Sequence, residues 1–319
     1  MFVEREAQAL SLQLPKRTAD SRGSARRVLG LAAMGAGVLV LGGCSSETKG
    51  EWERLAMPDP ASEQGEHILS LWQGAWIAAL ITGAVVWGLI FYSIWRFRRR
   101  SEDEIPVQTR YNLPLEIFYT IAPIIMVIVF FAKTVDTQNA VLDDDLPVDN
   151  TIEVVGQKWA WTFNYGIGEH DDSANEDATD DEFPYSSYVQ EIGTASYIPT
   201  LVLPVGETTR FNLHSPDVIH DLSVPAFLMK MDVVPGRVNH YDITPSRIGE
   251  FAGKCFELCG TYHSRMLFKV EVVSRADYDA YLQELQDAET PSDAPLLGGS
   301  FADTQAGLES GDESEEGAE

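Results

Sequence analysis

Apolar and charged positions divide the chain into segments of different kinds. Two long runs, Ile68 to Trp95 and Leu113 to Ala132, contain at most one charged side chain each. Each is long enough to cross about 30 Å of hydrocarbon as a helix. From Thr151 to about Val273 the chain changes to short runs rich in β-branched and aromatic residues, separated by Pro and Gly turn signals. This spacing predicts a compact antiparallel β sandwich or barrel. The predicted strands include 151–155, 159–165, 200–203, 208–213 and 266–273.

The connection between the two apolar runs is short and basic. It contains Arg96-Phe97-Arg98-Arg99-Arg100. Short basic connections stay in the cytoplasm, so we expect a transmembrane helical hairpin over residues 66–135, with spans at about 68–95 and 113–133. Everything after about Asp136 then lies outside the cytoplasm.

The N-terminus has the pattern of a processing signal. Arg26 and Arg27 precede an uncharged stretch, Val28 to Gly43, which ends in Leu-Gly-Gly-Cys44. A basic region followed by a short apolar stretch and small residues indicates a secretory signal. The ending resembles a bacterial lipoprotein signal, which predicts a signal at 1–43, lipidation of Cys44 and an extracytoplasmic segment at 44–65. The alternative is a third membrane helix with an incidental cysteine, but the stretch is shorter than the ~20 residues that a span needs.

Composition changes this picture in two ways. The 319 residues carry 23 Lys and Arg against 49 Asp and Glu, a net charge of −26, which argues against nucleic-acid binding. The acids are also concentrated. Residues 169–182 form an acidic loop inside the outer domain, 136–286. A short helix is expected at 276–286, and residues 287–319 have the composition of a disordered tail.

Candidate chemistry lies between Cys255 and Met266. Cys255, Cys259, His263 and Met266 offer two thiolates, an imidazole and a thioether within twelve residues, a soft ligand set that favours copper. Zinc could accept the cysteines and the histidine but would make little use of the thioether. A surface disulfide is the structural alternative. Candidates for a second imidazole are His214, His220 and His240, of which His220 is favoured by its place at a strand-to-turn boundary.

Three motifs carry a family resemblance. They are Asp217-Val-Ile-His220, then Lys230-Met-Asp232-Val-Val-Pro235-Gly236-Arg237, then Cys255-x-Glu257-x-Cys259-Gly260-x-x-His263-x-x-Met266. In this order they resemble subunit II of the haem-copper cytochrome c oxidases, and the resemblance covers roughly residues 66–286. It implies a membrane-anchored all-β protein, with a two-helix transmembrane hairpin followed by a cupredoxin-like β-barrel that holds two copper ions.

The resemblance also implies a role for each ligand. Cys255 and Cys259 would bridge the two copper ions, His220 and His263 would each bind one, Met266 would be a weak axial ligand, and Glu257 would offer its backbone carbonyl. The Glu257 carboxylate would be a ligand to a magnesium ion shared with subunit I.

Three further residues acquire roles through the resemblance. Trp159, in an aromatic strand, would receive the electron from cytochrome c. Glu116 would lie at the cytoplasmic mouth of a proton path, although an acid near a helix end can instead reach the membrane surface. Asp217 matches a position near the surface where the donor docks.

The function implied is that of subunit II of an aa3-type cytochrome c oxidase in a bacterial cell membrane. Electrons from cytochrome c, or from a membrane-bound cytochrome of a bc complex in a supercomplex, would pass to the haems of subunit I. There oxygen is reduced to water and protons are pumped. Subunits I and III are the expected partners. A quinol oxidase subunit, a soluble copper enzyme such as nitrous oxide reductase, and a copper-binding or assembly lipoprotein are the alternatives. The copper ligands disfavour the quinol oxidase subunit, which needs no copper. The hairpin disfavours the soluble enzyme, and the two-cysteine site together with Glu116 disfavours the assembly lipoprotein.

Overall fold

The computed structural model describes residues 46–101, 105, 107–143, 145–170, 183–194, 196–288 and 291–298. The predicted signal at 1–43, Cys44, residues 171–182 of the acidic loop and residues 299–319 of the predicted tail lie outside the described residues.

Two long helices follow a short one. The short helix is α2 (Ser46–Glu53), and the long ones are α3 (Glu63–Arg96) and α4 (Leu113–Val141). Each long helix begins at a polar cap. The Ser62 hydroxyl accepts a hydrogen bond from Gly65 N, and the Asn112 side chain accepts one from Leu115 N. Both helices are long and apolar enough to cross a membrane, and the most apolar stretch of each is unburied. The predicted pair of apolar helices is confirmed.

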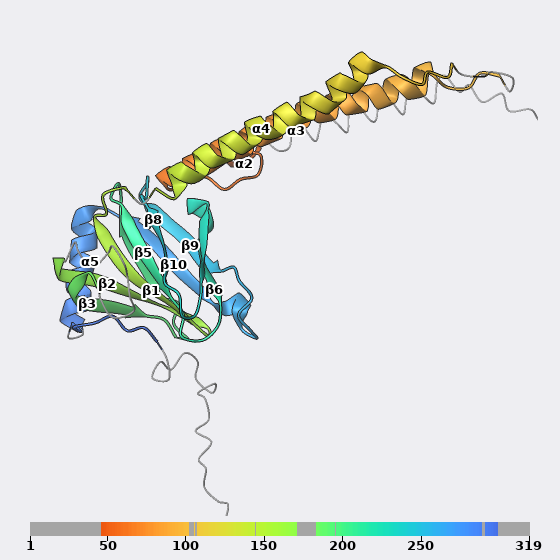
Figure 1. The fold of residues 1–319 in the computed structure, drawn as a ribbon. Coiled ribbons are helices and arrows are strands. Elements are labelled where there is room, and N and C mark those ends of the chain that lie inside the picture. Colours follow the sequence, from red (N-terminus) through yellow and green to blue (C-terminus); the bar gives the residue numbers. More distant parts are fainter. Residues whose placement is uncertain are drawn as a thin grey trace, which may run out of the picture. The chain divides into compact units, whose positions relative to one another are not determined.

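The C-terminal domain contains two five-stranded sheets (Figure 1). The first sheet has the order β3 (Tyr185–Ile192), β2 (Ala160–His170), β1 (Asn150–Gln157), β5 (Thr209–His214) and β8 (Asn239–Ile243). The second has the order β4 (Thr200–Pro204), β10 (Leu267–Val273), β9 (Gly249–Cys255), β6 (His220–Val224) and β7 (Met229–Val233). Two single 3₁₀ turns, η1 (Pro225–Phe227) and η2 (His263–Arg265), and helix α5 (Arg275–Ala288) complete the domain.

The sheets are mixed, which corrects the expectation of an antiparallel sandwich. β1 pairs with β5 in parallel, and β10 pairs with β4 in parallel. The chain crosses to the second sheet for β4 and returns to the first for β5, so strands that are neighbours in space are not consecutive. Strands β3 and β6 to β9 fall outside the predicted runs. In β7, for example, apolar and charged residues alternate from Met229 to Val233, which fits a strand with one buried face.

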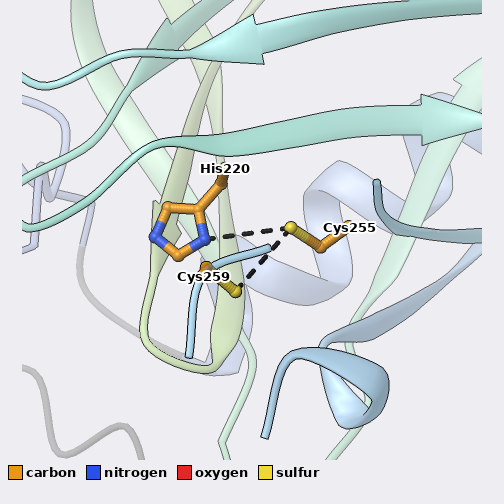
Figure 2. A group of neighbouring side chains, drawn as sticks. All are labelled: His220, Cys255 and Cys259. Atoms are coloured by element: carbon orange, nitrogen blue, oxygen red, sulfur yellow. Dashed lines mark hydrogen bonds between the residues drawn. The ribbon is translucent and has the colours of Figure 1, made fainter. Parts of the chain in front are cut away.

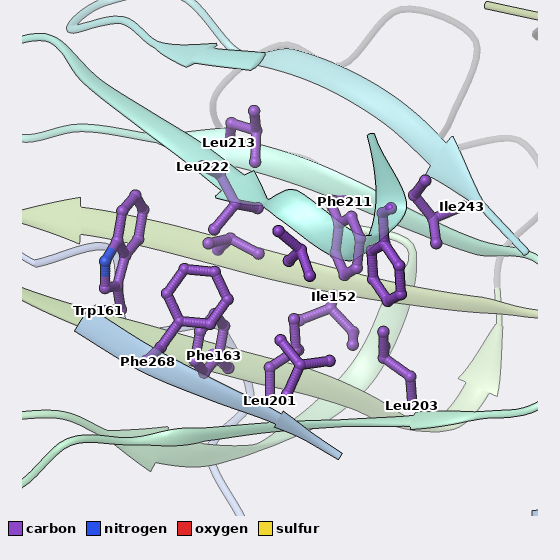
Figure 3. Close-up of a cluster of buried hydrophobic side chains, with 14 of the residues drawn as sticks. Ile152, Trp161, Phe163, Leu201, Leu203, Phe211, Leu213, Leu222, Ile243 and Phe268 are labelled. Carbon is purple, nitrogen blue, oxygen red and sulfur yellow. The ribbon is translucent and has the colours of Figure 1, made fainter. Parts of the chain in front are cut away.

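Side chains from both sheets interdigitate to form the core (Figure 3). Phe268 makes edge-to-face contacts with Trp161 and Phe163, at ring-centroid distances of 5.6 and 5.5 Å. Gly253 is required beneath this ring, because a Cβ there would lie 2.1 Å from Phe268 carbons. Trp161 also lies edge-on to His220, with the ring centroids 6.2 Å apart, so the core directly supports that histidine.

The segment that leads into α3 is bonded to the C-terminal domain. Ala61 N donates to Ala226 O, and Ser246 N donates to Ala61 O. The fully buried Ser62 hydroxyl donates to Phe227 O at 3.0 Å, and the Gln64 side chain accepts from Thr244 N at 3.1 Å. These bonds attach the start of the hairpin to the domain independently of the chain connection between α4 and β1.

The C-terminal segment differs from the prediction of a disordered tail from residue 287. Helix α5 continues to Ala288, and residues 291–298 lie across the outer side of the first sheet; we call them the strap. Ser292 forms a β-bridge with Tyr188 on β3. Leu296 N donates to the side chain of Asn164 on β2 at 2.8 Å, and Asn164 donates back to Leu296 O at 3.1 Å. Hydrogen bonds to backbone groups of Ser292 and Leu296 hold the strap, and the prediction missed it because the short run 294–297 was taken together with the acidic residues that follow.

Candidate metal centre

Three connections meet at one end of the two sheets. They are the two-residue turn 158–159 between β1 and β2, the loop 215–219 between β5 and β6, and the loop 256–266 between β9 and β10. We call the stretch 255–266 the ligand loop. Contacts join all three: Lys158 N donates to Asp217, and the Trp159 ring packs against Tyr262 of the ligand loop.

His220, Cys255 and Cys259 form a buried cluster with one ligand atom of each within 4.8 Å of the others (Figure 2). Cys255 Sγ lies 3.9 Å from His220 Nδ1 and 3.9 Å from Cys259 Sγ. His220 is fully buried on β6, whereas both cysteines belong to the ligand loop. Of the three histidines considered as the second imidazole, His220, which its strand-to-turn position favoured, is the one in this cluster.

Further donor atoms complete the cluster. His263 Nδ1 lies 3.5 Å from Cys259 Sγ, and Met266 Sδ lies 3.8 Å from the same sulfur. The backbone carbonyl oxygen of Glu257 lies 3.2 Å from Cys255 Sγ. Two sulfurs, two imidazole nitrogens, a thioether and a carbonyl thus converge. This is more than the four ligands of one tetrahedral zinc ion, and it suits a pair of soft metal ions bridged by thiolates.

Backbone bonds hold the ligand loop in this shape. Cys255 N donates to Met266 O at 3.1 Å, which brings the two ends of the loop together where β9 and β10 pair. Phe256 N donates to Asp221 O on β6 at 3.3 Å, so the loop is also tied to the strand that carries His220. Gly260 has a φ of 127°, a conformation that favours glycine.

Asp217 orients His220. Its Oδ1 lies 2.8 Å from His220 Nε2, which leaves Nδ1 directed at Cys255. Asp217 also accepts hydrogen bonds from Lys158 N at 2.8 Å and Val218 N at 2.6 Å. Burial opposes ionisation of Asp217, but these bonds outweigh it and the pKa of the carboxyl is lowered. Burial disfavours the charged form of His220 too, yet Asp217 and Cys255 raise the pKa of the imidazole.

The two thiols differ in acidity. Burial works against ionisation of Cys255, but the hydrogen bond with His220 and two backbone contacts lower the pKa of this thiol. Burial and the neighbouring Cys255 sulfur raise the pKa of the Cys259 thiol to about 12.

The structure also locates the residues of the alternatives to this ligand set: His214, His240 and a disulfide between the two cysteines. His214 Nε2 lies 2.6 Å from the buried carboxylate of Glu153. His214 and His240 both lie outside the metal-ligand cluster found among the described residues. The two sulfurs of Cys255 and Cys259 are 3.9 Å apart, and both thiols are free, so the structure contains no disulfide here.

Trp159 was expected to lie in a strand, but the structure places it in the turn that precedes β2. Its ring meets Tyr262 of the ligand loop edge-on, with the centroids 5.0 Å apart. The turn therefore brings Trp159 to the ligand loop. The contact with Tyr262 was not expected from the sequence, because the two residues are far apart along the chain.

The remaining predicted residues have these surroundings. Glu116 accepts a hydrogen bond from Asn112 N at 3.0 Å, so its carboxylate helps to cap α4. The carboxylate group of Asp217 is bonded inward, as described above, and the side chain is only partly exposed. Glu257 turns its carbonyl to the sulfur and has an exposed side chain. The contact of Asp217 with His220 was missed, although their spacing of three residues at a strand start offered a signal.

Comparison with known proteins identifies similar sequences over most of the chain. Residues 150–273 match the family "Cytochrome C oxidase subunit II, periplasmic domain", and residues 50–134 match "Cytochrome C oxidase subunit II, transmembrane domain". A probable cytochrome c oxidase subunit 2 of Streptomyces avermitilis is 45% identical over 276 residues, covering 80% of this chain and 86% of the relative. Cytochrome c oxidase subunit 2 of Mycobacterium bovis is 34% identical, covering 90% of each chain.

A solved structure of a relative was also found. The periplasmic domain of subunit II of cytochrome oxidase from Bradyrhizobium japonicum is 25% identical in sequence, with a TM-score of 0.36. The match covers 45% of this chain and 97% of that one.

Proposed function

Because this chain belongs to the cytochrome c oxidase subunit II family, we propose that it accepts electrons at a binuclear copper centre and passes them on within an oxidase complex. In this proposal the donor is cytochrome c or a membrane-bound cytochrome of a bc complex. The electrons go to the haems of subunit I in an aa3-type oxidase, where oxygen is reduced to water and protons are pumped. Subunits I and III are its partners in the bacterial cell membrane.

The observation that carries this proposal is the convergence of donor atoms around Cys255 and Cys259. Both sulfurs lie within 4 Å of a further donor atom, namely a nitrogen, a thioether or a carbonyl. Two thiolates shared by two metal ions let one electron delocalise over both, so that bond lengths change little on reduction. A bound copper pair would therefore supply rapid one-electron transfer.

The residues have separate tasks around such a centre. Cys255 and Cys259 would bridge, and His220 and His263 would each hold one ion. Met266 would be the weak axial ligand, and the Glu257 carbonyl would complete the set. Asp217 holds the ring of His220 in place through Nε2. The exposed carboxylate of Glu257 remains available for a magnesium ion shared with subunit I.

The finer assignments belong to the same proposal. Trp159 receives the electron, and its contact with Tyr262 of the ligand loop supports this role. Glu116 serves the mouth of a proton path, although its cap on α4 is a sufficient structural reason for an acid there. The segment 1–43 is a signal, Cys44 is lipidated, and the C-terminal domain lies outside the cytoplasm.

Electron paramagnetic resonance of the copper-loaded outer domain tests the proposal. One electron shared equally by two copper ions gives a seven-line hyperfine pattern. A four-line pattern would mean a single copper site, and silence together with bound zinc would mean the zinc alternative. Either result overturns the proposed centre.

Two substitutions separate the ligand roles. Met266→Leu removes the thioether sulfur that lies 3.8 Å from Cys259 Sγ but leaves both cysteines and both histidines, so we expect a shifted reduction potential with the shared-electron signal retained. Cys259→Ser removes a bridge, so we expect the signal to be lost. Equal loss of copper in both variants would show that the roles are wrongly assigned.

A further inference from the structure

We propose that the strap, residues 291–298, positions the candidate metal centre through its last residue, Gly298. This glycine packs against the two connections whose contact holds Asp217, the carboxylate that orients His220. Gly298 is therefore a positioning residue, which acts on the ligand through Asp217. The inference rests on the proposed function, and it gives the C-terminal segment a role in the affinity and the reduction potential of the copper pair.

The strap crosses the outer side of the first sheet toward the metal centre. At its start, Ser292 and Tyr188 on β3 exchange two backbone hydrogen bonds, of 2.8 and 3.0 Å. Farther along, both backbone groups of Leu296 are bonded to the side chain of Asn164 on β2. Because β1 is the next strand in the sheet, the strap ends with Gly298 beside the last residues of β1.

Gly298 fits tightly between the end of β1 and the loop that follows β5. A Cβ added to it would lie 2.5 Å from Gln157 Oε1, 2.9 Å from Pro216 Cγ and 3.2 Å from Val155 Cγ1. The Gln157 side chain could turn away, but the ring of Pro216 is fixed to its own backbone. The φ of Gly298 is 82°, a conformation that also favours glycine. Space and backbone conformation therefore both require glycine at this position.

The residues that the strap end contacts adjoin a hydrogen bond that supports the metal centre. Gln157 directly precedes Lys158, and Pro216 directly precedes Asp217. Lys158 N donates to Asp217 at 2.8 Å, and Asp217 Oδ1 lies 2.8 Å from His220 Nε2. The strap end thus holds both sides of the hydrogen bond between Lys158 and Asp217 together, one residue away from it.

The loop that follows β5 depends on contacts with other parts of the domain. Hydrogen bonds among Ser215, Asp217 and Val218 lie within the loop, so they set its shape but not its distance from β1. At its start, His214 Nε2 lies 2.6 Å from the buried carboxylate of Glu153 on β1. The strap end adds a second point of support, directly beside Asp217.

Loss of this support should loosen Asp217 and leave the bridging cysteines in place. A carboxylate that holds the second nitrogen of a ligating histidine makes the imidazole more basic. A looser Asp217 therefore weakens copper binding. It also raises the reduction potential, because the oxidised pair carries more positive charge and depends more on a basic ligand.

The experiment uses the full-length chain, purified in detergent and loaded with copper. Two variants remove the support: truncation after Ala288 deletes the strap, and Gly298→Ala adds the Cβ that the packing excludes. Truncation after Gly298 is the control for the first, because it removes only residues 299–319. Gly206→Ala, in the turn between β4 and β5, is the control for the second: its φ is 75°, and a Cβ there would meet nothing within 4 Å.

We expect both variants to lower the apparent copper affinity about threefold to tenfold, because they loosen a partner of the ligand without removing it. Competition with a chelator measures the affinity. The reduction potential should rise in both, and the seven-line pattern should remain. In an Asp217→Asn background, Gly298→Ala should have no further effect, because the strap acts through that carboxylate.

Hydrogen exchange of the copper-free chain provides a readout that does not depend on the metal. The amide of Lys158 should exchange faster in both variants than in the wild type, because its bond to Asp217 opens more often. The two controls should exchange at the wild-type rate.

Equal copper affinities and potentials in the variants and their controls would overturn the inference. An additive loss in the Asp217→Asn background would also overturn it, because the strap would then act on the domain as a whole. Unchanged exchange at Lys158 would have the same meaning. A wild type without the shared-electron signal would instead refute the proposed function. The exchange measurement would still show whether the strap holds Asp217, so the two failures are distinguishable.

Discussion

Asp217 shows how one side chain outside the ligand set shapes the candidate metal centre. It contacts no sulfur in the structure, yet it fixes which nitrogen of His220 faces Cys255. Carboxylates that hold the second nitrogen of a ligating histidine set the ring orientation and make the ligand more basic. The backbone NH of Lys158 in turn holds Asp217, so the turn that presents Trp159 also supports the ligand.

We expect Asp217→Asn to weaken copper binding without unfolding the domain. An amide retains the size of the carboxylate but not its charge, so the apparent copper affinity should fall by about 10-fold to 100-fold. Competition with a chelator of known affinity measures this. Glu250→Gln is the control, because Glu250 is an acid on β9 away from the cluster. Equal affinities for the two variants would contradict the role of Asp217.

The residue scale also shows what spacing along the chain can predict. The side chains of Cys255, Cys259, His263 and Met266 are close in sequence, and their spacing alone indicated a soft metal site, whereas the carbonyl of Glu257 was assigned only through the family resemblance. His220 was found by its boundary position. The contacts of Trp159 with Tyr262 and of Lys158 with Asp217 join residues on different loops, and only the fold brings these loops together.

The strap is the element that departs most from the structure predicted for its part of the chain. Asn164 is fully buried and makes both hydrogen bonds to Leu296, as well as one to Glu153 O at 3.0 Å. The Asn164 side chain therefore bonds both the NH and the carbonyl of Leu296, as the backbone of a neighbouring strand would. Averaged over 287–319, the acidic composition predicts disorder, and it hides the short apolar run 294–297 as well as the bonds that the strap backbone makes.

Asn164→Ala should release the strap. The substitution leaves Leu296 N and O without their partner, and we expect it to lower the free energy of unfolding by about 2 kcal/mol. Hydrogen exchange at 292–298 should also become faster. Asn239→Ala removes an amide with one solvent-exposed bond, to Asp232 O, and should cost less than about 0.5 kcal/mol. Unchanged exchange in Asn164→Ala would show that the strap is held by other contacts.

Charge and apolar surface are unevenly distributed over the whole molecule. The most apolar stretches of α3 and α4 are unburied, as expected of helices that face lipid or partner subunits. The fold class followed from the sequence because long apolar runs and short β-rich runs are strong, repeated signals. The parallel pairings were missed because they depend on the order in which the chain visits the two sheets.

Truncation after Gly298 tests the effect of the overall charge. It removes seven acidic residues and no basic one, which changes the net charge from −26 to −19. We expect electron transfer from a basic cytochrome c to slow severalfold at low ionic strength and to be unaffected at high ionic strength. Copper content and thermal stability should not change. A slower rate that persists at high salt would mean that the tail acts through a specific contact.

The ligand loop has a consequence for protein engineering. Five of the six donor groups lie on one segment that connects two adjacent strands, β9 and β10. Transplanting residues 255–266 into another sandwich would carry these five together, and the host would need to supply only an imidazole opposite them, with a carboxylate behind it. The host would also need a core side chain that supports the imidazole, as Trp161 supports His220 here.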